Sequence, residues 1–201
     1  MAGRLTVLTD DRLDVLRPVI DARVKAAAEL VGEAAFDEFF DRTMRAQLLA
    51  ALASADAHEG TVWLLDQTRS FLVPRFNSGP NAEQFVGSYR QSLRSGMISM
   101  VVATEQPVCE NEVHRNEQQD KSLDQKLGLS TCAMLAVPFY FAGELRGVIS
   151  AVQMQVAGDS APEPPGFTVA NLATLQLAAS VLERMIEHQL MSLALGREEF
   201  R

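Results

Sequence analysis

One histidine and two glutamates stand at every second position near the middle of the chain, a pattern that can bind a metal or haem. Glu110, Glu112 and His114 would share one face of a strand, because side chains alternate along a strand. Imidazole and carboxylate groups are ligands for several metals. Cys109 would lie on the opposite face, so the set lacks the spacing of a metal site. We expect a solvated polar surface and no metal site.

Cys109 and Cys132 are the only cysteines, and they are too few for a disulfide framework. If their strands are neighbours they can form a redox switch, because exposed thiols of low pKa react with oxidants. No lysine or arginine flanks either residue to favour the thiolate. We expect both to pack as small hydrophobic side chains.

Motifs of common enzyme classes do not occur in the chain. It contains three histidines, and it lacks G-x-S-x-G, a P-loop, a dinucleotide-binding glycine motif and H-E-x-x-H. We therefore expect that the protein is not an enzyme.

The composition disfavours two kinds of partner. The 201 residues carry a formal net charge of −8, with 47% hydrophobic and 22% charged residues, as in ordinary globular proteins. The negative charge disfavours nucleic acid and anionic membrane surfaces. No apolar run reaches the roughly 18 residues of a membrane span, and the N-terminus lacks a signal-peptide core. We expect a cytoplasmic protein with no nucleic acid and no membrane partner.

Helices are predicted at both ends of the chain. In the first, Pro18 predicts that a short helix ends near Arg17 and that a new helix begins at Pro18. A second helical stretch, over residues 34–54, has one broad apolar face. The last helix is capped by Thr168 and keeps near-heptad apolar spacing.

The most apolar stretch, Thr131–Val156, predicts a hairpin of two central strands. Its two apolar runs are joined at Gly143, which can supply the positive φ of a short turn. Both runs are too apolar for a sheet that is wetted on one face. Both faces of this hairpin should therefore be covered.

Shorter segments complete the sheet. Thr61–Asp66 and Ser70–Phe76 predict a second hairpin, in which Pro74 favours an edge position. Gly96–Thr104 fits either a strand or a short helix, and Val108–Val113 fits a strand. The order predicts an α+β fold with a central antiparallel sheet of five to six strands. Terminal helices would cover one face, and pocket-covering loops and short helices the other.

The chain resembles a GAF domain from about Phe36 to Met191. Glu59–Asp66 is similar to the first strand of that family, and Gly96–Val113 to its glycine, short helix, turn and P-V strand. Met134–Met154 carries the most specific similarity: a strand ending in V-P, a turn with glycine, and G-V-I in the next strand. The resemblance implies a GAF-like (PAS-related) fold and favours the short helix over Gly96–Thr104.

The resemblance also implies a role and a domain organisation. GAF domains are regulatory modules that sense a small molecule or a partner and are usually dimeric through their terminal helices. We expect a homodimer, an unidentified small-molecule ligand and a separate signalling output protein. The divisions would be an N-terminal helical extension (1–33), a GAF-like domain that includes the long C-terminal helix (34–195), and a tail (196–201).

Particular GAF subtypes match less well. Cyclic-nucleotide-binding members carry an Asn-Lys pair where this chain has Gln153-Met154, and an acidic pair that is missing after Phe167. Bilin-binding members attach the pigment to a cysteine near a histidine, and Cys132 has no such neighbour. Free methionine sulfoxide reductases cluster several cysteines around the pocket, and only two cysteines exist here. The cofactor remains unknown.

A GAF-like pocket would lie between the sheet and its covering segments. Methionines adapt to apolar ligands, and aromatic residues commonly line such pockets. The candidate ligand-binding residues are Tyr89, Met97, Cys132, Met134 and Tyr140. One alternative is a ligand-free scaffold for dimerisation or partner docking. Another is a cysteine-based redox sensor or a methionine sulfoxide reductase-like enzyme.

Overall fold

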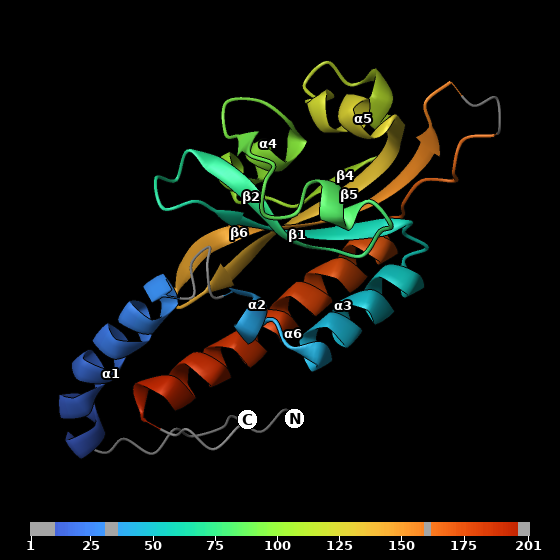
Figure 1. Ribbon diagram of the computed structural model, residues 1–201. Helices are drawn as coiled ribbons and strands as arrows, with labels where there is room; N and C mark the ends of the chain where they lie inside the picture. The colour runs from blue at the N-terminus through green and yellow to red at the C-terminus, as the bar shows by residue number, and fades with distance from the viewer. Residues whose placement is uncertain (1–10, 31–35, 159–161, 197–201) are drawn as a thin grey trace.

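A six-stranded antiparallel sheet lies between two helical layers (Figure 1). One layer contains α3 (Arg42–Ser54) and α6 (Val169–Ala194), and the other contains α4 (Met97–Thr104) and α5 (Ser122–Leu127). The computed structural model describes residues 11–30, 36–158 and 162–196. The residues predicted as the start of the N-terminal extension (1–10) and the last five residues lie outside this part. This is the predicted α+β architecture.

The elements follow in this order: α1 (Asp11–Leu30), α2 (Phe36–Phe39), α3 (Arg42–Ser54), β1 (Glu59–Leu65), β2 (Phe71–Asn77), a 3-10 turn (Ala82–Gln84), β3 (Gln91–Ser92), α4 (Met97–Thr104), β4 (Val108–Glu110), a 3-10 turn (Val113–Arg115), α5 (Ser122–Leu127), β5 (Leu129–Phe141), β6 (Glu144–Val156) and α6 (Val169–Ala194). The strand order in the sheet is β3-β2-β1-β6-β5-β4.

The predicted central hairpin is present as β5 and β6. Ala142 and Gly143 connect the strands, with φ of 53° and 73°, and positive φ at both positions is typical of a type I′ turn. Side chains of β5 alternate between the two covered faces. Leu135, Val137 and Phe139 pack toward the helical layer, and Met134 and Ala136 pack toward α4. The apolar composition of both runs is thereby explained.

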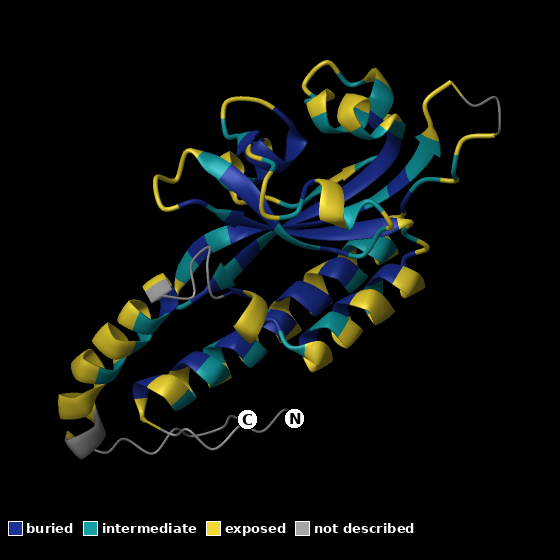
Figure 2. Ribbon diagram, viewed as in Figure 1, coloured by how far each residue is buried: buried dark blue, intermediate teal, exposed yellow. Residues whose placement is uncertain are grey.

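The helical layer holds the larger core. Leu48 of α3 and Leu182 and Ile186 of α6 are fully buried against alternate residues of β1, β5 and β6. Figure 2 shows the buried faces of α3 and α6 turned toward the sheet, whereas most of α1 is exposed. α6 begins with the predicted cap, because the Thr168 hydroxyl accepts from Asn171 N at 3.2 Å and the Asn171 side chain accepts from Thr168 N.

The prediction of a break at Pro18 was wrong, because α1 continues through it. A proline within a helix leaves the carbonyl four residues earlier without its donor. Here that carbonyl belongs to Asp14, which is exposed, so water can solvate it. α1 lies along the C-terminal part of α6, where Arg23 Nη1 donates to Ala194 O at 3.2 Å.

The helix predicted over residues 34–54 is instead divided. α2 ends at Phe39, and Asp41 then caps α3 by accepting a hydrogen bond from Met44 N at 2.9 Å. An aspartate before an apolar helical segment is a strong N-cap. That signal outweighs the continuous apolar pattern, which spans both pieces.

Two predictions about the smaller strands were also inexact. Pro74 is not on the edge strand, because β3 pairs with β2 at Phe71 and Leu72. β3 ends before reaching Pro74, whose carbonyl accepts from Gly87 N at 2.8 Å. β4 ends at Glu110 instead of Val113, because the Glu110 carboxylate accepts from Glu112 N at 3.0 Å and turns the chain.

Candidate functional site

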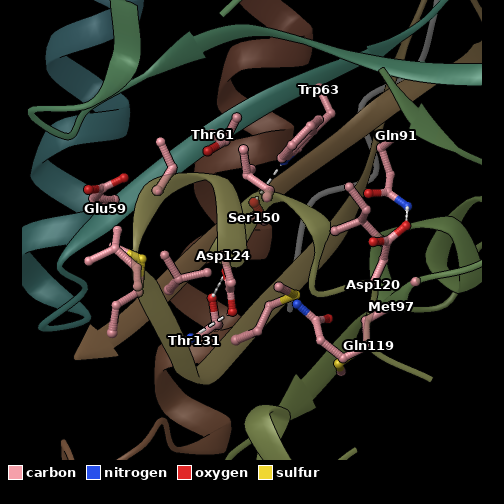
Figure 3. Close-up of a pocket in the computed structure, with 18 of the residues that line it drawn as sticks. Glu59, Thr61, Trp63, Gln91, Met97, Gln119, Asp120, Asp124, Thr131 and Ser150 are labelled. Carbon is pink, nitrogen blue, oxygen red and sulfur yellow. Dashed lines mark hydrogen bonds between the residues drawn. The ribbon is translucent and has the colours of Figure 1, made fainter. Parts of the chain in front are cut away.

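A pocket lies between the sheet and the segments around α4 and α5 (Figure 3). Its floor comes from β1, β2, β5 and β6, and its walls and roof from α4, α5 and the loop before α5. The free volume is about 70 Å³. Ligand pockets usually enclose about 300–1,000 Å³, so a bound molecule larger than a head group requires the covering segments to move.

Polar side chains cross the floor on three adjacent strands. Thr61 of β1 is the register partner of both Asn77 of β2 and Ser150 of β6. Asn77 Nδ2 donates to Thr61 Oγ1 at 2.9 Å and to Glu59 Oε2 at 3.1 Å. Beside them, Trp63 Nε1 donates to Ser150 Oγ at 2.9 Å. These five side chains are all buried, and this network positions them.

Two aspartates contribute to the roof. Asp124 of α5 accepts from both the backbone N and the hydroxyl of Thr131, each at 2.9 Å. Asp120, just before α5, accepts from Gln91 Nε2 at 3.1 Å and from Ser122 N at 3.0 Å. Hydrogen bonding from Ser122 holds the pKa of Asp120 below its ordinary value despite partial burial. This carboxyl group is therefore ionised at neutral pH.

Of the five predicted ligand-binding residues, Met97 and Met134 line the pocket. Tyr89 lies next to it: its ring is edge-on to Trp63 at 6.2 Å, and its hydroxyl bonds to Gln91 and Ser122. Cys132 is buried but not among the lining residues. It occupies an irregularity in the β5–β6 pairing between Thr131 and Ala133, so simple alternation does not give its direction.

Tyr140 lies away from the pocket, near the end of β5. Its hydroxyl donates to Glu105 Oε2 at 2.8 Å, and its backbone N donates to Glu183 Oε1 at 3.0 Å. Burial, together with these two carboxylates, raises the pKa of Tyr140 to about 12. Glu105 caps the C-terminus of α4, and Glu183 belongs to α6. Tyr140 thus joins a pocket-covering helix to the terminal helix.

The polar residues of the pocket were not among the predicted candidates. The signal was present in β1, where Glu59, Thr61 and Trp63 alternate with Val62 and Leu64. Val62 and Leu64 face the helical core. Glu59, Thr61 and Trp63 face the pocket. Polar residues at every second position share one face of a strand. When both faces of the strand are buried, such residues indicate a binding site, because buried polar groups are costly unless they form hydrogen bonds.

The thiols show no sign of activation. Both cysteines are free. Cys132 is buried as expected, but the expectation was wrong for Cys109, which is exposed. Desolvation raises the pKa of both thiols, and Glu110 raises that of Cys109 further. A raised pKa disfavours the thiolate, which is the reactive form.

The polar set around His114 does not form a metal site. His114 Nε2 lies 3.3 Å from Glu163 Oε1, and Glu110 accepts from Glu112 N and Asn116 Nδ2. Within residues 11–30, 36–158 and 162–196, no group of three or more His, Cys, Asp or Glu residues could hold a metal ion.

A sequence model described as GAF domain matches residues 33–187. The chain belongs to the GAF domain family. GAF domains are generally small-molecule-sensing regulatory modules. None of the curated proteins matches the chain. No helix in the described part of this GAF domain is long and apolar enough to cross a membrane.

Solved structures share the fold of this GAF domain at low sequence identity. The GAF domain of a phosphoenolpyruvate-protein phosphotransferase from Acinetobacter is 19% identical with a TM-score of 0.55, covering 94% of this chain and 99% of that one. Its counterpart from Coxiella burnetii is 18% identical with a TM-score of 0.57, covering 88% and 96%. A type II free methionine-R-sulfoxide reductase from Thermoplasma acidophilum is 18% identical with a TM-score of 0.56, covering 75% and 94%.

Proposed function

We propose that this GAF domain is a cytoplasmic regulatory module that binds a small ligand in the pocket and relays its occupancy through the terminal helices of a homodimer. The buried polar floor carries the proposal. Thr61, Asn77 and Ser150 are each less than a tenth exposed, on a sheet whose other face is apolar. These residues bond to one another, but apolar residues at the same positions would avoid the cost of removing polar groups from water. A ligand that bonds to them gives them a role.

The contacts of Tyr140 supply a route for the relay. The N-terminal turn of α4 lines the pocket with Met97 and Ile98, and Glu105 at its other end accepts the Tyr140 hydroxyl. The backbone of Tyr140 is held by Glu183 of α6 on the opposite face of the sheet. A ligand that binds one position of α4 better than another would shift the population of α6 positions.

Exposed apolar residues on the terminal helices support the dimer. They include Val15, Leu16 and Val19 on α1, and Val169, Leu177, Val181, Met191 and Leu193 on α6. Apolar patches on helices commonly mark association surfaces. The relayed signal would pass to a separate signalling output protein, without a reaction catalysed by this chain.

Native mass spectrometry with an absorption spectrum of the freshly purified protein tests ligand binding. We expect a co-purifying small molecule that is lost on denaturation. Sedimentation tests the dimer: a monomer at tens of micromolar, about the concentration where weak interfaces are populated, would contradict the relay through paired helices.

A ligand-free scaffold for dimerisation or partner docking is the second candidate, and the small free volume of about 70 Å³ favours it. A space of this size holds a small group at most while the covering segments stay in place. In that case Thr61→Val and Ser150→Ala would leave association unchanged, and the native mass spectrum would show protein alone.

A cysteine-based redox sensor or a methionine sulfoxide reductase-like enzyme has less support, because desolvation raises the pKa of both thiols. Replacing Cys109 and Cys132 by serine should leave the response to peroxide unchanged. A peroxide response that disappears in the double variant would revive this candidate.

A further inference from the structure

The charges of the pocket are all of one sign. Glu59, Asp120 and Asp124 contribute carboxyl groups, and the described residues that line the pocket include no lysine, arginine or histidine. The two lysines of the α5 region are engaged elsewhere: Lys121 Nζ donates to His114 O at 2.8 Å, and Lys126 Nζ to Gln84 O at 3.0 Å. The carboxyl groups therefore have no basic partner from this segment.

Of the three carboxyl groups, that of Glu59 is the least compensated by hydrogen bonds. It is only 7% exposed, and among the described residues the one hydrogen bond of its carboxyl group is that which Oε2 accepts from Asn77 Nδ2. In the described part of the chain, no donor reaches Oε1 and no cation pairs with the carboxylate. A buried carboxylate with one neutral donor is poorly compensated, because buried charges in proteins are normally paired. A positively charged ligand would supply the missing partner.

The backbone near Glu59 leaves room for its carboxyl group. A Cβ added to Gly79 would overlap the Glu59 carboxyl, and φ at Gly79 does not itself require glycine. Gly79 N also donates to Asn77 Oδ1 at 2.7 Å, which orients the Asn77 amide toward Glu59. The turn after β2 thus holds this carboxylate in position.

Asp120 and Asp124 can accept more hydrogen bonds than the protein itself donates to them. A carboxylate can accept about four hydrogen bonds. Asp124 accepts two, both from Thr131, and Asp120 accepts from Gln91, Ser95 and Ser122. The pocket consequently offers acceptors in excess and suits a molecule rich in N–H donors.

We propose that the pocket binds the head group of a small organic cation, an amidinium, guanidinium or ammonium group, through Glu59, while Asp120 and Asp124 elsewhere in the lining add negative charge. This rests on the proposed ligand-binding function and names the class of ligand. In the described part of the chain these carboxyl groups do not gather into a group that could hold a metal ion, whereas an organic cation can bond to a single carboxylate through two N–H donors. The free volume of about 70 Å³ lies well below the usual 300–1,000 Å³ of ligand pockets, which suits a head group and not a larger molecule.

Three isosteric probes test the charge: acetamidinium, acetamide and acetate. The protein contains one tryptophan, Trp63, whose indole N–H bonds to Ser150 on the pocket floor. Its side-chain signal in a proton–nitrogen NMR spectrum is therefore a single reporter. We expect acetamidinium to shift this signal saturably, and acetamide and acetate to leave it unchanged at equal concentration and ionic strength.

Two variants and a control locate the site. Glu59→Gln keeps an acceptor for Asn77 but removes the charge, and should weaken acetamidinium binding about tenfold or more, as expected for a lost charge-assisted bond. Gly79→Ala displaces the carboxyl group while keeping the net charge, and should weaken binding similarly. Glu187→Gln, a partly buried change on α6 across the sheet from the pocket, should have no effect.

The outcomes separate the cationic-ligand inference from the broader proposal that the pocket binds a small ligand. An equal response to acetamide or acetate overturns the cation class but leaves the pocket a ligand site. No response to any probe also overturns the cation head group, and a native mass spectrum with a bound neutral or anionic molecule would still uphold the ligand-binding function. An acetamidinium response that persists unchanged in Glu59→Gln and Gly79→Ala assigns the cation to another place and refutes the proposal.

Discussion

Replacing the buried Asp66 should destabilise the β1–β2 turn. Asp66 is 4% exposed. Its Oδ1 accepts from Ser70 N at 2.8 Å and Phe71 N at 3.0 Å, and its Oδ2 accepts from Thr68 Oγ1 at 2.7 Å. Oδ2 also lies 3.5 Å from Arg90 Nη1, which precedes the pocket residue Gln91. The carboxylate therefore fixes both the turn and the approach to β3.

The hydrogen bonds to the Asp66 carboxylate determine how much its replacement lowers the free energy of unfolding. Hydrogen bonds to charged groups contribute about 1.5–3 kcal/mol each. Ser70 and Thr68 are exposed, so water can replace part of what they lose. Asp66→Ala should lower the free energy of unfolding by about 2–4 kcal/mol. Asp66→Asn keeps an acceptor at the Oδ1 position for both backbone donors, and should cost about 1–2 kcal/mol.

The loss of stability in the Asp66 variants should depend on pH. Burial raises the pKa of Asp66, but hydrogen bonds from Thr68, Phe71 and Ser70 outweigh it and hold the pKa below its ordinary value. A depressed folded-state pKa stabilises the protein above the unfolded value of about 3.9, and this contribution is lost as the pH falls through the folded value. The difference between wild type and Asp66→Asn should therefore be constant near neutrality and shrink below about pH 4.

Urea unfolding followed by circular dichroism measures both effects, with the exposed Asp21→Ala as the control. An Asp66→Ala variant within about 0.5 kcal/mol of wild type, the usual range of surface changes, would refute the hydrogen-bond accounting. A wild type to Asp66→Asn difference that does not shrink on acidification would refute the depressed pKa.

Three further changes test other parts of the fold. Gly147→Ala should cost about 3 kcal/mol or more in urea unfolding, because its Cβ would overlap the Trp63 carbonyl on the paired strand; a normal midpoint would contradict the close β1–β6 approach. Asp41→Ala should cost about 1 kcal/mol by removing the α3 cap, and a cost that vanishes would mean the cap is not formed. Tyr140→Phe should remove the phenol that titrates at about 12, leaving only Tyr89 in an ultraviolet pH titration; loss of a phenol of ordinary pKa, about 10, would separate Tyr140 from Glu105.

Local signals predicted the scaffold well. The hairpin could be predicted because Gly143 stands between two apolar runs, and the start of α6 because Thr168 and Asn171 form a capping pair. Asp41 and Pro18 were misjudged for opposite reasons. Asp41 is a helix cap inside a continuous apolar pattern. Pro18 lies inside a helix, where the exposure of the backbone to water reduces the free-energy cost of the missing hydrogen bond.

The pocket was harder to predict because its residues meet only in three dimensions. Met97 and Met134 were found from composition, whereas Tyr140 lies near the end of its strand, beyond the reach of the pocket. A bulge next to Cys132 changes the alternation of β5. Asp120 and Asp124 precede and occupy a short helix whose placement over the sheet depends on the side-chain bonds to Gln91 and Thr131.

The two edge strands of the sheet have a consequence for aggregation. β3 contains two residues and β4 three, so neither edge strand itself offers a long row of unpaired backbone groups to a strand of another molecule. Beyond β4, one amide of β5 is already bonded by a side chain, Tyr140 N to Glu183. Short edges of this kind protect proteins against edge-to-edge growth into fibrils. Crowded or partly unfolded conditions should therefore lead to amorphous precipitate before ordered cross-β assemblies.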